Sequence, residues 1–385
     1  MSQQLYAAID VGGTKIAAAL VDAEGTLLTR AELPTPPKGS GGEEVMATVG
    51  ALVDALAEDA RWADDVVGVG IGSAGPVDPT RGTVSPVNIP GWRDFPIVDQ
   101  VKGLKPVGGL EVVLVGDGSA MAAGEHWRGA ARGYDNALCL VVSTGVGAGL
   151  ILDGVLRTGP SGNAGHLGHI SVDVEGEDCP CGSRGCLETI ASGTSIARWA
   201  VQNGWRMRSD NVVETNFRPT RGALGSVGSG TALDPDVTVT TAVTTAAVAA
   251  ADMAASAGTE AALTTTAITG SDITEAALTA FAVTAADIAA SARAGDEIAL
   301  AAFERAGRAL AAGIAATAML VDIRAAVIGG GVAKSGEVLF DPLRRHLNRY
   351  ASLPFTHDLD ILPAKLGGDA GLIGAVAALA RPTRG

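Results

Sequence analysis

Two similar hairpins dominate the hydrophobic pattern of the chain. Apolar runs at 5–9 and 16–21 flank a Gly-Gly turn, and the stretch 137–156 again has a strand, a glycine-rich turn and a strand. Buried strands joined by short glycine turns are typical of β-hairpins. The repeated opening predicts an internal duplication, in which each copy is a βββαβα unit. Because any two buried hairpins share these features, the duplication is a hypothesis that the sheet order tests.

Helical and strand patterns alternate through the rest of the chain. Apolar residues at helical spacing, and short apolar runs that end in glycine turns, predict further elements. These are a helix over 41–60, a strand over 66–78, a strand and helix over 111–127, helices over 192–202, 284–320 and 368–380, and a strand with a turn over 325–335. The alternation predicts an α/β fold.

The segment 206–284 has a different composition. It is rich in Ala, Thr, Ser and Gly, and it has no aromatic residue between Phe217 and Phe281. Such a composition favours incomplete order, because few large side chains are present to form a core. We expect a partly ordered insertion that contains a helix at 244–256, and we assign no chemistry to it.

The overall charge excludes one class of partner. The chain has 385 residues and a formal net charge of -14, and a uniformly acidic protein repels the phosphates of nucleic acids. Its hydrophobic content is 47%, but no apolar run approaches the roughly 20 residues of a membrane span. The start, MSQQLYAAID, has no signal-peptide pattern. We expect a cytoplasmic protein without nucleic-acid or membrane partners.

The first glycine turn has the features of a phosphate site. Gly12 and Gly13 let backbone N–H groups approach phosphate oxygens without a Cβ in the way. Thr14 adds a hydroxyl donor, and Lys15 adds a positive charge. Asp10, at the end of the strand, is placed for a magnesium shell. A single Gly-Gly hairpin is weak evidence for a nucleotide site.

Two further glycine turns follow buried strands and strengthen this interpretation. The second contains Thr144, Gly145 and Gly147, and the third contains Gly330 and Gly331. Together the three turns suit a nucleotide, with two turns for the phosphates and one for the adenosine. They match neither the Walker pattern nor the full dinucleotide-binding pattern.

Asp117 is the candidate general base. It follows the apolar strand 112–115 and precedes a helical pattern, so its carboxylate could accept a proton from a substrate hydroxyl. In phosphoryl transfer the protein mainly positions groups and neutralises charge, so one base and Mg²⁺ suffice. The alternative is that Asp117 only caps the helix.

Three of the four cysteines lie close together. Cys179, Cys181 and Cys186 occur in one glycine-rich loop, and His169 lies ten residues upstream. Three thiolates and one imidazole form a complete tetrahedral zinc set. Because no ligand position remains for water, the pattern predicts a structural zinc site. The alternative is that the three cysteines are ordinary thiols that bind no metal. Their close spacing in the sequence disfavours this alternative.

The chemistry-bearing motifs resemble those of the ROK family of bacterial sugar kinases and related repressors. They occur in the family's order over about residues 5–375, and only the segment 206–284 is unlike the family. They are DVGGTK (10–15), GIGSAGPVD (70–78), NIPGWRDFP (88–96), GDGSAMAAGE (116–125), STGVGAGLILDG (143–154), GH (168–169), CPCGSRGCLE (179–188) and IGGGVA (328–333).

The resemblance implies a two-lobed actin-like ATPase fold, related to ribonuclease H, that binds ATP and Mg²⁺. We expect a small lobe of residues 1–118 and 368–385. The large lobe would be residues 119–367, with a zinc loop at 169–188 and the atypical segment 206–284. The resemblance also implies a homodimer or homotetramer. Polyphosphate stays open as an alternative phosphoryl donor.

The resemblance also assigns roles in the acceptor site. It implies that Asp117 takes the proton from the primary hydroxyl of a sugar. One ring nitrogen of His169 would bind zinc and the other would face the sugar, which zinc ligation would orient. Glu188 would accept hydrogen bonds from the C1 and C2 hydroxyls, and Asn88 lies in the matching sugar-side loop.

Two positions depart from the family's glucokinases. Gly116 stands where they have Asn, and His166 stands where they have Glu; in the family both side chains reach the sugar near its 3-hydroxyl. Losing hydrogen-bond partners weakens binding of the ordinary sugar. We therefore expect a kinase for a modified hexose or a hexose-like C7-cyclitol. The alternative is a plain glucokinase, in which water and His166 replace the lost contacts.

Two other functions remain as alternatives. A non-catalytic sugar sensor would keep the fold, although the intact Asp117 argues against it. A repressor of the same family would carry a helix-turn-helix domain before the first turn, and only nine residues precede Asp10 here. The negative charge also disfavours a repressor.

Overall fold

The structure is a computed structural model. It describes residues 4–37, 41–86, 89, 91–207, 283–381 and, for the backbone alone, 383–384. Asn88 and the helix predicted at 244–256 lie outside the described residues.

The first sheet contains the N-terminal hairpin, in the strand order β3-β2-β1-β4-β7. The first three strands pair antiparallel, whereas β4 and β7 run parallel to β1. Helix α1 packs on β2 and β3. We call this sheet and its helices the first lobe. Its elements are β1 (Leu5–Val11), β2 (Lys15–Asp22), β3 (Leu27–Pro34), α1 (Gly42–Ala57), α2 (Trp62–Asp65), β4 (Val66–Ser73), β5 (Val77–Asp78), β6 (Thr83–Val84), α3 (Ile97–Lys102) and β7 (Glu111–Gly116).

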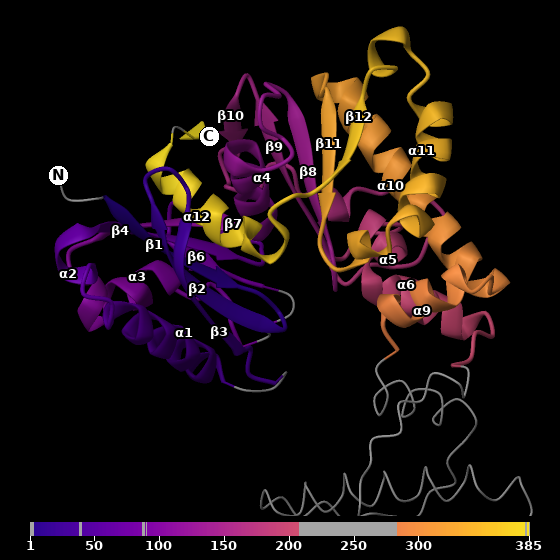
Figure 1. The fold of residues 1–385 in the computed structure, drawn as a ribbon. Helices are drawn as coiled ribbons and strands as arrows, with labels where there is room; N and C mark the ends of the chain where they lie inside the picture. Colours follow the sequence, from indigo (N-terminus) through magenta and orange to yellow (C-terminus); the bar gives the residue numbers. More distant parts are fainter. Residues whose placement is uncertain are drawn as a thin grey trace, which may run out of the picture. The chain divides into compact units, whose positions relative to one another are not determined.

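The second sheet repeats the order of the first. Its order is β12-β11-β8-β9-β10-β13, and β8, β9 and β10 pair antiparallel while β11 and β12 run parallel to β8. Apart from the edge strand β13, each strand therefore has a counterpart in the first sheet (Figure 1). The predicted duplication is confirmed. The strands are β8 (Ala137–Val142), β9 (Val146–Leu152), β10 (Val155–Arg157), β11 (Ala325–Gly329), β12 (Asp360–Pro363) and β13 (Thr383–Arg384).

Two helices join the sheets. Helix α4 (Asp117–Arg128) follows the last strand of the first sheet but packs on β8 and β9, and α12 (Ala370–Ala380), yellow in Figure 1, packs on β1 and β4. The two helices also pack on each other. A Cβ on Gly374 of α12 would overlap the carbonyl oxygen of Ala120, so only glycine permits this close approach.

The buried carboxylate of Glu125 fixes the end of α4. Its oxygens accept hydrogen bonds from the backbone N–H groups of Ala130, Lys365 and Leu366, at 2.6 to 3.2 Å. A buried carboxylate needs such partners, because burial without them is costly. Glu125 thus ties α4 to the segment that leads into α12, and it helps to hold Asp117 in place at the other end of the helix.

The helices around the second sheet complete what we call the second lobe. Helix α10 packs on α5, α6, α9 and α11. The helices are α5 (Leu187–Ala191), α6 (Gly193–Gln202), α9 (Ala285–Arg293), α10 (Glu297–Val321) and α11 (Glu337–Tyr350), with the short 3-10 turns η2 (Leu167–His169), η4 (Val332–Ser335) and η5 (Pro354–Thr356). The turn η1 (Lys105–Val107) lies in the first lobe beside α1 and α3, and η6 (Gly367–Asp369) leads into α12. In the described part of the chain, no helix combines the length and apolarity that crossing a membrane requires.

One predicted helix is wrong in its extent. The helical pattern over 284–320 is two helices, because α9 ends before Gly295, which has a φ of 85°. The side chain of Asp296 then accepts a hydrogen bond from the N–H of Ala299 and begins α10. The apolar periodicity continues across this break, so the pattern alone concealed it.

Candidate active site

A small pocket surrounds the start of α4, with a volume of about 20 Å³. Residues of both lobes line it. They are Gly75, Gly116, Asp117, Gly118, Ser119, Gly147, Ala148, Gly162, Asn163, Ala164 and His166. The pocket therefore brings the predicted base together with both positions that depart from the family pattern.

Asp117 is placed by the junction of β7 and α4. Gly116 is the N-cap of α4 and Asp117 its first residue, so the carboxylate does not have the capping role considered above. Its Oδ1 accepts a hydrogen bond from the N–H of Gly118 at 2.7 Å. The pKa of Asp117 is raised to about 6, mainly by burial; the Gly118 hydrogen bond opposes this rise, and the negative charge of Glu188 adds to it. A pKa near the working pH suits a general base.

Asp10, at the end of β1, is close enough to Asp117 for the two charges to interact. Burial raises the pKa of Asp10 to about 7, and Asp117 contributes to the rise, while Lys15 and Arg30 lower it. A divalent cation would stabilise the ionised forms of two buried carboxylates, and Mg²⁺ prefers oxygen ligands. The Asp10 side chain therefore fits the predicted magnesium position.

The first glycine turn is held by Thr35, which directly follows β3. The N–H of Gly12 donates to the carbonyl oxygen of Lys15 at 3.0 Å, and the hydroxyl of Thr35 donates to the carbonyl oxygen of Gly12 at 2.7 Å. Gly13 and Thr14 are exposed. The Lys15 ammonium pairs with Glu32 at 3.0 Å, so this conformation does not leave it unpaired for a phosphate.

The second and third turns lie on neighbouring strands, because β8 and β11 pair in parallel. The hydroxyl of Thr194 on α6 donates to the carbonyl oxygen of Thr144 at 2.9 Å and holds the second turn. In the third turn, Gly330 has a φ of 88° and Gly331 is exposed. The predicted phosphate and adenosine turns are thus adjacent in the second lobe.

The predicted zinc ligands gather as expected. Each of His169, Cys179, Cys181 and Cys186 offers one ligand atom, and these atoms lie within 4.8 Å of one another. Nδ1 of His169 lies 3.6 Å from Sγ of Cys179, and the Sγ atoms of Cys181 and Cys186 are 3.7 Å apart. Zinc–sulfur bonds of about 2.3 Å give tetrahedral edges of about 3.8 Å. The set therefore fits a structural zinc ion.

His169 also faces Glu188, another acceptor residue that the resemblance implies. Its Nε2 lies 3.9 Å from Oε1 of Glu188, while its Nδ1 faces the thiols. The other carboxylate oxygen of Glu188 accepts a hydrogen bond from the N–H of Val146 at 2.7 Å. Glu188, in the first turn of α5, is thereby linked both to the cysteine cluster and to the second glycine turn.

His166 lies on the pocket side of His169. The two rings stack with their centroids 5.2 Å apart and their planes 17° apart. Burial lowers the pKa of His166, and the neighbouring His169 lowers it further, so the neutral ring is favoured. His166 is therefore part of the pocket wall and outside the cysteine cluster.

Asn163 is a pocket residue that the sequence interpretation missed. Its side-chain amide pairs with both backbone groups of Val77, which belongs to the other lobe. The only sequence signal was a polar residue in a glycine-rich loop just before His166, and that pattern does not reveal a partner 86 residues away.

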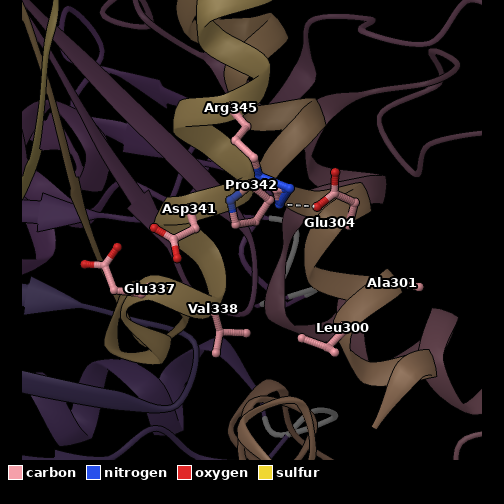
Figure 2. Close-up of a pocket in the computed structure, with 8 residues that line it drawn as sticks. All are labelled: Leu300, Ala301, Glu304, Glu337, Val338, Asp341, Pro342 and Arg345. Carbon is pink, nitrogen blue, oxygen red and sulfur yellow. Dashed lines mark hydrogen bonds and ion pairs between the residues drawn. The ribbon is translucent and has the colours of Figure 1, made fainter. Parts of the chain in front are cut away.

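A larger groove lies elsewhere in the second lobe (Figure 2). It has a volume of about 580 Å³ and lies between α10 and α11. Glu304 on its wall pairs with Arg345 at 2.7 Å and with His346 at 2.8 Å. It contains none of the predicted site residues, so its size does not make it the acceptor site.

The fold and the site define a class of protein. Two sheets of the same order, joined by two helices, with acidic residues at strand ends and glycine turns beside them, form the two-lobed actin-like ATPase fold. The sequence model of the ROK family matches residues 6–224 and 259–382. The chain belongs to the ROK family, and it is a sugar kinase within it.

Individual relatives agree with this membership. A glucokinase of Streptomyces coelicolor is 32% identical over 372 residues, which cover 95% of each chain. The crystal structure of a ROK family glucokinase from Streptomyces griseus in complex with glucose and AMPPNP matches with a TM-score of 0.67 and 32% identity, over 96% of this chain and 97% of that one. An N-acetylmannosamine kinase of Yersinia pestis is 38% identical over 200 residues, 52% of this chain and 64% of that relative.

Proposed function

We propose that this kinase transfers the γ-phosphoryl group of ATP to the primary hydroxyl of a modified hexose or a hexose-like C7-cyclitol. The observation that carries the proposal is the composition of the pocket beside Asp117, where Gly116 and His166 replace two sugar-binding side chains. The phosphotransferase activity itself agrees with the glucokinases that the chain resembles along almost its full length.

The Gly116 corner of the pocket has spare room. The φ of Gly116 is -66°, which any residue adopts. Among the described residues, a Cβ at this position would meet only Cγ2 of Val77, at 4.0 Å. Neither backbone geometry nor packing therefore requires glycine here. The missing side chain leaves space for a larger acceptor substituent and removes a hydrogen-bond partner for the ordinary hydroxyl.

The His166 wall favours an uncharged acceptor. The lowered pKa of the imidazole favours its neutral form, which has one donor and one acceptor nitrogen. A carboxylate at this position would attract a cation, but a neutral ring does not. The pocket is therefore better suited to hydroxyl or other neutral substituents than to a 3-amino sugar.

The remaining residues have separate proposed roles in the reaction. Asp117 accepts the proton of the acceptor hydroxyl as the hydroxyl oxygen attacks the γ-phosphorus, and the bond from the γ-phosphorus to the bridging oxygen breaks to release ADP. Glu188, His169 and Asn88 hold the other hydroxyls. Asp10 would hold magnesium, which would neutralise phosphate charge. The nucleotide contacts come from Gly12, Gly13, Thr14, Lys15, Thr144, Gly145, Gly147, Gly330 and Gly331.

The zinc ion has a structural role in this proposal. It fixes the orientation of His169 and of the loop 169–188 that leads to Glu188, and it takes no part in the transfer. We also propose the lobe boundaries given above, 1–118 with 368–385 and 119–367. A cytoplasmic homodimer or homotetramer without nucleic-acid or membrane partners completes the proposal.

An acceptor panel tests the substrate assignment. The measurement is kcat/KM for glucose, mannose, N-acetylated sugars, 3-amino sugars and C7-cyclitols, with ATP and with polyphosphate as donors. We expect a neutral modified hexose or a C7-cyclitol to exceed glucose. Glucose as the best acceptor by a wide margin would contradict the proposal.

A double variant tests the two positions directly. Restoring the family side chains with Gly116→Asn and His166→Glu adds two hydrogen-bond partners, so kcat/KM for glucose should rise by roughly tenfold or more. The matched control makes the same chemical changes at exposed positions, with Gly41→Asn and His357→Glu, because a Cβ on Gly41 meets no described atom within 4 Å. An unchanged preference in the double variant would remove the basis of the proposal.

The second candidate is a plain glucokinase. It is favoured by the 32% identity to glucokinases over 95% of the chain, and the same panel decides between the two. A non-catalytic sugar sensor would bind sugars in a calorimetric titration but release no ADP with any of them.

A further inference from the structure

The second glycine turn contacts both carboxylates of the acceptor site. A Cβ on Gly147 would lie 3.1 Å from Oδ1 of Asp117, and a Cβ on Gly145 would lie 2.6 Å from Oε2 of Glu188. The N–H of Val146 donates to the same Glu188 oxygen at 2.7 Å. The turn that is predicted to bind phosphate therefore also packs against the residues that are predicted to bind the acceptor.

The corner between α5 and α6, residues 188–195, also holds this turn. The hydroxyl of Thr194, in the first turn of α6, donates to the carbonyl oxygen of Thr144 at 2.9 Å. The N–H of Gly193 donates to the carbonyl oxygen of Ser143 at 2.6 Å, and a Cβ on Gly193 would lie only 2.9 Å from that oxygen. Both hydrogen bonds use backbone carbonyl groups of the turn, and the side chain of Thr144 stays exposed.

The same α5–α6 corner carries Glu188. The carbonyl oxygen of Glu188 accepts hydrogen bonds from the hydroxyl of Ser195 at 3.0 Å and from the N–H of Ser192 at 3.2 Å. The hydroxyl of Ser192 donates to that of Ser195 at 2.8 Å and lies 3.0 Å from that of Thr194. Glu188 and Thr194 are thus joined within the corner, and each also bonds to the glycine turn.

These hydrogen bonds form a closed ring. It runs from the carboxylate of Glu188 to the glycine turn, from the turn to Thr194, and through the hydroxyls of α6 back to the backbone of Glu188. A ligand that orders one part of such a ring reduces the freedom that a second ligand must remove elsewhere, so the second ligand binds more tightly. Glu188 lies on the acceptor side of the ring, and the glycine turn lies on its phosphate side.

We propose that Thr194 is a positioning residue, which holds the second glycine turn on the α5–α6 corner and thereby couples nucleotide binding to acceptor binding. It acts through the carbonyl group of Thr144 and contacts neither substrate. The inference rests on the proposed function, in which Glu188 binds the acceptor and the turn binds phosphate. The coupling is reciprocal, because each ligand must tighten the binding of the other by the same factor.

Calorimetric titrations provide the first test, with glucose and the ATP analogue AMPPNP with Mg²⁺ as probes. In the unmodified enzyme, saturating glucose should lower the Kd of AMPPNP by roughly fivefold or more. Thr194→Val removes the hydroxyl, so the effect of glucose should shrink to about twofold or less. Thr194→Ser keeps the hydroxyl and should keep the coupling. A lack of coupling in the unmodified enzyme, or full coupling in Thr194→Val, overturns the proposal.

Thr48→Val is the matched control. The hydroxyl of Thr48 likewise donates to a backbone carbonyl oxygen, that of Glu44, at 3.1 Å. Because Thr48 lies on α1 of the first lobe, outside the ring, this variant should keep the full coupling. Thermal unfolding checks that each variant is folded. An equal loss of coupling in Thr48→Val would show a general effect of removing a hydroxyl and would overturn the role of Thr194.

Hydrogen exchange at the Gly193 amide provides a second test that needs neither turnover nor nucleotide. Saturating glucose should order the ring and slow exchange of this amide by roughly threefold or more, and Thr194→Val should abolish the slowing. Exchange at Gly193 that does not respond to glucose overturns the proposal. The acceptor panel tests the substrate separately. Glucose as its best acceptor would contradict the proposed function but leave the coupling intact, so the two failures can be distinguished.

Discussion

The two copies of the duplicated unit have the same strand order but carry different chemistry. In the first sheet, the ends of β1 and β7 carry Asp10 and Asp117. In the second sheet, the counterparts of these strands are β8 and β12, and neither is followed directly by an acidic residue. The second copy instead gains its functional side chains from an insertion after β10, which carries His166, His169 and Glu188. In the proposed function, the first copy therefore provides the two carboxylates used in transfer, and the insertion in the second copy provides His166, His169 and Glu188 for acceptor recognition.

The insertion needs contacts of its own to hold its side chains in place, whereas the strand ends of the first copy do not. Strand ends are fixed by their ladders, so Asp10 is positioned by the sheet, and Asp117 is positioned by the junction of β7 with α4. The loop 158–186 has no such ladder. It is held by the cysteine cluster and by Asn163, and α5 then carries Glu188 back to the N–H of Val146. We therefore expect that substitutions in the first copy impair the reaction by removing a charge. Substitutions in the second copy should impair it by displacing the side chains that its loop carries.

The largest effect should come from the first copy. Asp117→Ala removes the base, so kcat should fall by roughly 10²- to 10⁴-fold with folding intact. Thermal unfolding monitors the fold, and Asp99→Ala on the exposed face of α3 is the control. Turnover close to normal in Asp117→Ala would refute the assignment of the base.

The pH profile follows from the same carboxylate. The base must be deprotonated to accept a proton, and burial raises the pKa of Asp117 to about 6. The value of kcat/KM should therefore decrease as the pH falls through about 6 and level off above it. A profile that stays flat from pH 5 to 8 would argue against Asp117 as the titrating group.

Disrupting the cysteine cluster should impair the second copy. Metal analysis should find about one zinc per chain, and Cys181→Ser should release it. Because the proposed zinc would orient His169, sugar affinity should weaken by roughly 10- to 100-fold, with a smaller change in the KM for ATP. Cys139→Ala is the control, since this cysteine is buried in β8 outside the cluster. Equal losses of sugar and ATP affinity would contradict the division between the copies.

Sequence reasoning worked where the determinants are local. Glycine turns after apolar runs identified both hairpins, and the spacing of Cys179, Cys181 and Cys186 identified the cluster. It failed where a partner is distant in the chain. The packing of α4 on the second sheet depends on contacts with β8 and β9, and the pairing of Asn163 with Val77 depends on a turn formed 86 residues earlier. Neither follows from periodicity, because the pattern along one segment does not encode its tertiary partner.

The smallest effect should come from the exposed ion pairs of the first copy. Glu32 pairs with Lys15 at 3.0 Å and with Arg30 at 2.6 Å, and both cations border the first glycine turn or Asp10. Exposed ion pairs contribute little to stability, so Glu32→Gln should leave the thermal midpoint nearly unchanged. It should release Lys15 towards phosphate and lower the KM for ATP by about twofold, with the KM for the acceptor unaffected. A change in the KM for the acceptor alone would be inconsistent with Lys15 as a phosphate ligand.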